Sequence, residues 1–121
     1  MTISAGGTID NAAGMLGNLA GSYGAMTVTG AGSLWDVSGD LNVGHVGEGD
    51  LTVALGGDVT AARSFIGNED GSVGTATVSG NGSSWVTTGD LYVGKEGTGT
   101  LTIAGGGAVS ADEIIIASES G

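Results

Sequence analysis

The sequence predicts an all-β fold: a right-handed parallel β-helix (β-solenoid) of about five coils, with about 25 residues and three short strands per coil. Three observations lead to this prediction. The chain contains a duplication of about fifty residues, a shorter period lies inside that duplication, and the composition combines 27 glycines with no proline. Strands that are paired on both sides exclude proline, since it would remove a hydrogen bond from the sheet.

The duplication covers most of the chain. Residues 1–50 align with residues 51–100 without gaps, at about 22 identical positions. A third copy begins at residue 101, where "LTIAGGGAV" matches the "LTVALGGDV" that begins at residue 51. We therefore assign residues 1–121 to a single repeat domain with units 1–50, 51–100 and a partial 101–121, and we expect it to be part of a larger protein.

A shorter period of about 25 residues runs through both copies of the duplication. A threonine, the aliphatic residue after it and a glycine each recur with this spacing, and they define a predicted structural ladder: Thr2, Thr27, Thr52, Thr77 and Thr102; Ile3, Val28, Val53, Val78 and Ile103; Gly7, Gly32, Gly57, Gly82 and Gly107. Apolar residues flank each threonine, and this alternation indicates a strand with one buried face. One such strand per period, with no helical periodicity between, favours coils stacked in register over a propeller, whose blades need about 40 residues or more.

Each coil has room for two further strands. A glycine corner precedes a second one in "GGDVTA" and "GGAVSA", and a third lies in "SFIG", "DLNVG", "DLYVG" and "IIIA", with Val43, Ile66, Val93 and Ile116 pointing inward. The predicted coils are 1–24, 25–49, 50–74, 75–99 and 100–121. They alternate between a type a (first, third, fifth) and a type b (second, fourth), and each type b coil carries a tryptophan.

The orientation of the tryptophans is open at this stage, because the third strand begins later in type b coils than in type a coils. Trp35 and Trp85 point either inward, beside Ile9 and Val59, or outward, beside Asp10 and Thr60. We favour inward or corner packing, since an exposed indole would leave a large apolar area in water.

Charge and composition exclude several functions. The formal net charge is −11, and Arg63 and Lys95 are the only lysine or arginine residues. We therefore expect no nucleic-acid partner and no docking on an anionic membrane surface. No apolar run approaches the roughly 18 residues of a membrane span, so we expect no membrane insertion by this segment. No secretion signal is present, so secretion would require a signal outside this stretch.

The segments "TVTGAGSLWDVSGDLNVGHVGEGDLTVALGGDVTA" (27–61) and "TVSGNGSSWVTTGDLYVGKEGTGTLTIAGGGAVSA" (77–111) resemble the repeat associated with autotransporter passengers and PEP-CTERM surface proteins. The elements that carry the resemblance are G-x-G-S-x-W, G-D-L-x-V-G and G-x-L-T-V-x-x-G-G, with 1–24 and 112–121 as partial copies. The resemblance implies a β-helix that serves as a shaft in a bacterial extracellular or cell-surface protein, supports adhesion or display, and has no defined active site. The host or surface ligand is left unknown.

Other sites are less well supported. The threonine ladder would suit ice binding only if T-x-T were regular, but the second threonine changes side between coils. Acidic corners at 67–72 and 47–50 carry oxygen ligands suited to calcium, yet Asp70 is matched by Ala20 and Ser120 in the other copies, which favours solvated turns. We expect no metal and no cofactor.

Catalysis has little support in the sequence. His45 is the only histidine, and its repeat partner is Lys95, which suggests an exposed corner. Asp40 and Asp90 recur within G-D-L, which suggests turns in which the aspartate accepts hydrogen bonds from nearby backbone N–H groups. We expect no catalytic residue and no enzymatic activity.

The ends of a solenoid leave backbone groups unpaired, which invites axial self-association. The sequence thus leaves a second hypothesis open, in which copies of the chain stack end to end into an extracellular filament.

Overall fold

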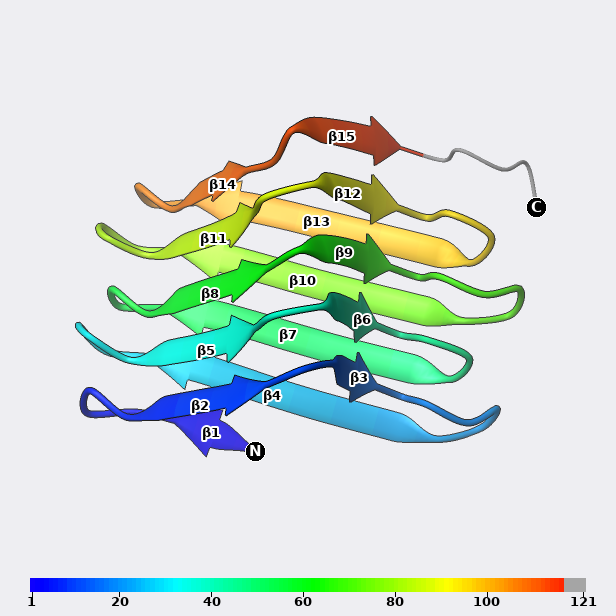
Figure 1. Ribbon diagram of the computed structural model, residues 1–121, viewed down its shortest axis with the longest axis horizontal. Helices are drawn as coiled ribbons and strands as arrows, with labels where there is room; N and C mark the ends of the chain where they lie inside the picture. The colour runs from blue at the N-terminus through cyan, green and yellow to red at the C-terminus, as the bar shows by residue number, and fades with distance from the viewer. Residues whose placement is uncertain (117–121) are drawn as a thin grey trace.

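The computed structural model describes residues 1–116, all of whose regular elements are strands. The chain winds upward through five coils in a right-handed sense, and each coil lies on the one before it (Figure 1). The predicted β-helix is therefore confirmed. The end of the partial unit 101–121, including Ser120, lies outside the described residues.

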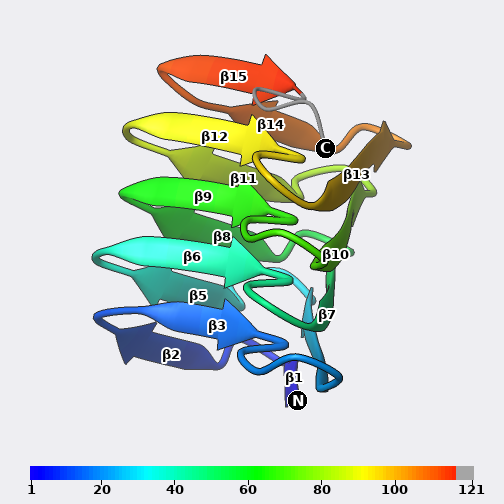
Figure 2. The ribbon, with the colours of Figure 1, turned by 90° about the vertical axis from the view of Figure 1, so that its right-hand side faces the viewer.

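Fifteen strands form three parallel sheets of five strands, one strand per coil in each sheet. Sheet A contains β1 (Thr2–Ile3), β4 (Tyr23–Thr29), β7 (Glu48–Ala54), β10 (Val73–Ser79) and β13 (Thr98–Ala104). Sheet B contains β2 (Thr8–Asn11), β5 (Leu34–Val37), β8 (Asp58–Ala61), β11 (Ser84–Thr87) and β14 (Ala108–Ser110). Sheet C contains β3 (Gly14–Leu16), β6 (Asp40–Val43), β9 (Arg63–Ile66), β12 (Asp90–Val93) and β15 (Glu113–Ile116). Seen from the side, sheets B and C lie close together, and sheet A forms a separate wall (Figure 2).

Sheet A keeps the spacing of the threonines without interruption. Its strands pair in register, so that Thr27, Thr52 and Thr77 are direct neighbours. Thr2 and Thr102 extend the row at its two ends. The aliphatic residue that follows each threonine turns inward, and Val28, Val53 and Val78 are fully buried.

Sheets B and C depart from that spacing because the corners of the two coil types differ in length. Trp35 pairs with Ile9 of the coil before it and with Val59 of the coil after it. The sequence separation from Ile9 to Trp35 is therefore longer than the sheet A period, and the separation from Trp35 to Val59 is shorter. In sheet C, Leu41 pairs with Gly14 on one side and with Ser64 on the other. A type b coil has extra residues before its third strand and correspondingly fewer residues between that strand and the next threonine. The sheet A register is therefore the same in every coil.

Both tryptophans point inward. Trp35 is 2% exposed and Trp85 is fully buried, each in a column with Ile9, Val59 and Val109. Each indole extends toward the small residue of the preceding type a coil. A Cβ on Gly14 would lie 2.7 Å from the Trp35 ring, and Trp85 Nε1 donates a hydrogen bond to Ser64 Oγ at 3.2 Å. A type a coil and the type b coil after it are therefore shaped for each other, which explains why the true repeat unit is a pair of coils rather than a single one.

The glycine ladder is predicted incorrectly. Gly32 and Gly82 adopt positive φ and pack against Gly6 and Gly56, not against Gly7 and Gly57. The reason is the longer corner of the type b coil, which shifts its glycine by one position. Gly7, Gly57 and Gly107 share a different role, in which their N–H groups close tight turns on Ser4, Ala54 and Ala104.

Candidate functional site

The outer face of sheet C carries a row of large side chains. Successive coils contribute Met15, Asn42, Phe65, Tyr92 and Ile115, paired in that order. The Phe65 and Tyr92 rings are stacked, with centroids 5.1 Å apart and planes 5° from parallel. Strands one coil apart lie close to that spacing, so a stack along the helix axis follows directly from the fold.

A hollow of about 570 Å³ lies on this face, and we call it the sheet C hollow. Residues of β3, β6, β9 and β12 and of the turns beside these strands line it. Asn42 stands between Met15 and Phe65 in the row, and its side chain is smaller than either. The hollow thus lies along four consecutive members of the row, Met15, Asn42, Phe65 and Tyr92.

One wall of the hollow is an ion pair. Arg63 Nε and Nη2 donate hydrogen bonds to the two carboxylate oxygens of Asp40, at 3.0 and 2.9 Å. The guanidinium carbon of Arg63 also lies 5.7 Å from the centre of the Phe65 ring. The hydrogen bond to Asp40 and the charge of that carboxylate raise the pKa of Arg63 above its ordinary value. Within residues 1–116 this is the single ion pair.

This pairing corrects the prediction for Asp40. In the described chain the Asp40 carboxylate accepts no backbone hydrogen bond from its own turn, and its two oxygens accept hydrogen bonds from Arg63 of the next coil instead. Asp90, its repeat equivalent, pairs instead with Glu113 in the sheet C register. The two recurrent aspartates therefore have different surroundings.

The opposite wall is a group of planar polar side chains. Asn68 Nδ2 donates to Asn42 Oδ1 at 2.6 Å, and His45 Nδ1 lies 3.3 Å from the same oxygen. Asn42 is 4% exposed and Asn68 9% exposed. His45 is half-buried rather than at an exposed corner, since it packs toward this amide pair. Lys95 and Glu69 complete this side of the hollow.

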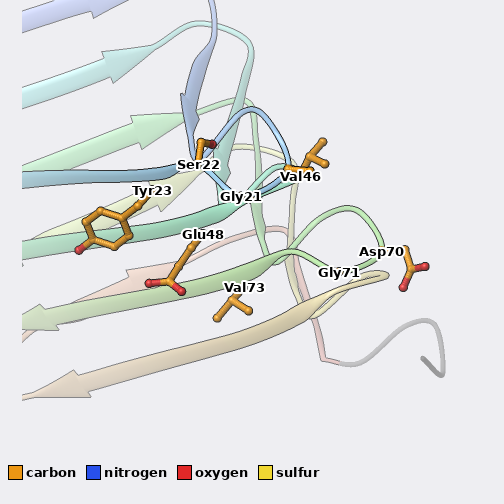
Figure 3. Close-up of a pocket in the computed structure, with 10 residues that line it drawn as sticks. Gly21, Ser22, Tyr23, Val46, Glu48, Asp70, Gly71 and Val73 are labelled. Carbon is orange, nitrogen blue, oxygen red and sulfur yellow. The ribbon is translucent and has the colours of Figure 1, made fainter.

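A second hollow of about 410 Å³ lies at the turns that lead from sheet C to sheet A, and the acidic corners border it. Figure 3 shows Glu48 in a row between Tyr23 and Val73, while Asp70 lies out on its turn. Of the acids in the two corners, Glu48 and Asp70 line this hollow, and the two side chains lie apart. In the described part of the chain, no group of three His, Cys, Asp or Glu side chains is arranged to hold a metal ion.

The sequence also contains a second glycine column that the ladder omits. Gly24, Gly49, Gly74 and Gly99 pair with one another in sheet A. A Cβ on Gly74 would overlap the carbonyl oxygen of Val43, because the end of sheet C passes directly beneath. These glycines recur with the same spacing as the threonines of the ladder, and that spacing is the signal that could have identified them.

No helix long and apolar enough to cross a membrane occurs within residues 1–116. Comparisons of the chain with protein-family models, with curated proteins and with solved structures found no match.

Proposed function

We propose that this protein is a structural shaft of a bacterial secreted or cell-surface protein, similar to an autotransporter passenger, which holds other parts of the protein away from the cell for adhesion or display. The observation that carries the proposal is the unbroken register of the five coils. All three sheets run the length of the described chain, and every coil shares its core with its neighbours. Such a stack is extended and can be lengthened coil by coil, as a spacer requires.

Two features of the sequence support an extracellular setting. The repeat resembles that of surface proteins, and the net charge of −11 favours solubility and suits a chain exposed to solvent along its length. Neither depends on a catalytic group, and the proposal assigns none.

The test is whether the protein is exposed on intact cells of the organism that encodes it. An antibody raised against residues 1–116 should label unlysed cells, and external protease should remove that labelling while a cytoplasmic marker remains intact. Labelling that appears only after lysis would contradict the proposal.

A second candidate, a filament built from stacked copies, is favoured by the apolar end of the fifth coil. Ile103, Ile114 and Ile116 are 47%, 45% and 72% exposed. They continue columns in which Val78 and Leu91 are fully buried and Val93 is 7% exposed. Sedimentation at increasing concentration distinguishes the candidates, because a filament grows with concentration and a chain that stays monomeric at all concentrations does not stack.

A further inference from the structure

The sheet C hollow is lined by residue types that are rare in this chain. The chain has two residues with fixed positive charge and one histidine among 121 residues. All three, Arg63, Lys95 and His45, line this one hollow. The only phenylalanine and one of the two tyrosines line it as well. An outer face that served only to solvate a strand would not need this combination.

The polar groups are held in position by one another and retain hydrogen-bonding capacity. Arg63 uses two of its N–H groups on Asp40, which leaves further donors in the same plane. Asn68 and His45 converge on Asn42, whose amide is almost fully buried. Carboxylate, amide, imidazole and guanidinium groups thus present fixed donors and acceptors around one space.

An apolar surface borders these groups. Met15 is 47% exposed and Tyr92 is half-buried, so part of each side chain remains open to a ligand. Phe65 supports Tyr92 from below through the ring stack. A ligand that fits must therefore offer hydroxyl-type groups, which donate and accept, together with an apolar C–H surface for the aromatic side.

Charge narrows the class of ligand. Asp40 and Glu69 line the hollow together with the cations, and the whole chain carries −11. A polyanion would meet a repulsive field on approach. A metal ion would meet the guanidinium and ammonium groups. We propose that the sheet C hollow binds a neutral oligosaccharide, and its volume of about 570 Å³ falls within the range of small-molecule sites.

The experiment is a titration followed by two-dimensional NMR of the 15N-labelled chain. The probes are neutral hexasaccharides of glucose, mannose and xylose, each added separately, with an oligogalacturonate as the anionic comparison. Saturable shifts should appear at the side-chain amides of Asn42 and Asn68 and at Arg63 Nε with at least one neutral probe. They should be absent with the oligogalacturonate.

The matched variants are the two tyrosines. Tyr92→Ala should weaken binding about tenfold, the loss expected when one aromatic contact is removed. Tyr23→Ala should leave the affinity unchanged, because Tyr23 is 61% exposed and lies outside the hollow. The indole N–H signals of Trp35 and Trp85 report that each variant is folded.

Lys95→Ala provides a second variant at the opposite wall and should also weaken binding. The proposal is overturned if no neutral probe shifts the three reporter groups, if only the oligogalacturonate does so, or if Tyr23→Ala weakens binding as much as Tyr92→Ala. Because this site is tested on the isolated chain, its failure leaves the shaft proposal standing, and the reverse also holds.

Discussion

The two buried indole N–H groups find different partners in equivalent coils. Trp35 Nε1 donates to Asn11 Oδ1 at 3.1 Å, and Trp85 Nε1 donates to Ser64 Oγ, which also lies 2.8 Å from Thr87 Oγ1. A buried indole must satisfy its polar edge, and both do so with a residue of the preceding type a coil. Each tryptophan therefore fixes a type b coil to the coil before it through both packing and a hydrogen bond.

Leu55 has a backbone conformation that is unfavourable for a residue with a side chain. It adopts φ of 53° at the corner before sheet B and is 73% exposed. Ala5 takes the same conformation in the first coil, and Gly105 takes it in the fifth. The left-handed region costs a non-glycine residue about 1–2 kcal/mol, so this corner in the middle of the β-helix is strained.

We predict that Leu55→Gly raises the free energy of unfolding by about 0.5–1 kcal/mol, which is the backbone strain relieved less the entropy that glycine adds to the unfolded chain. Urea unfolding measures the change. Leu55→Ala is the control, because it removes the same exposed side chain and keeps the strain. An equal gain in both variants would show that the exposed leucine, and not its φ, is responsible.

The joint between sheets A and C depends on glycine for a different reason. At Gly74 the strand passes so close to the end of β6 that any side chain would overlap the Val43 carbonyl. Gly71, three positions earlier in the chain, has φ of 82°, and a Cβ added there would meet no atom within 4 Å. The two positions separate the steric role of glycine from its conformational role.

We predict that Gly74→Ala lowers the free energy of unfolding by more than about 3 kcal/mol, since backbone rather than a flexible side chain must move. Gly71→Ala should cost about 1–2 kcal/mol, the strain of positive φ alone. Denaturant titration of both variants gives the comparison. Losses of similar size would mean that the close approach of sheets A and C is not required.

The period of the threonine ladder predicts sheet A almost completely because the corners before that sheet restore its register in each coil. The same period does not predict the register of sheets B and C, because that register depends on the lengths of the corners, which differ between the two coil types. Phe65 and Tyr92 are farther apart in the chain than one period, and Asp40 and Arg63 are closer together than one period. An alignment of the coils at a fixed period therefore does not predict that either pair is in contact. The repeat thus predicts the stacked coils of the β-helix, while the sheet C hollow follows only from the three-dimensional register.

At the scale of the whole molecule, each coil is stabilised by the coils that cover its apolar residues on either side. Ala76, Val78 and Leu91 are fully buried because a coil covers them on each side, whereas Ile103 and Ile114 in the same columns are exposed. Each coil thus depends on its neighbours, as in other solenoids. The contacts between type a and type b coils are also directional, since each tryptophan packs against the coil that precedes it.

The central claim is that residues one period apart in sheet A lie side by side, and cysteine pairs test it most directly because the chain has no cysteine of its own. Thr52→Cys with Thr77→Cys places the thiols on adjacent strands, about 5 Å apart, within reach of a disulfide or a short thiol crosslinker. Thr27→Cys with Thr77→Cys places them two coils apart, about 10 Å, beyond that reach. We predict efficient crosslinking within a monomer for the first pair and none for the second. Equal crosslinking of both pairs, or crosslinking of the second alone, would contradict the stacked winding of the chain.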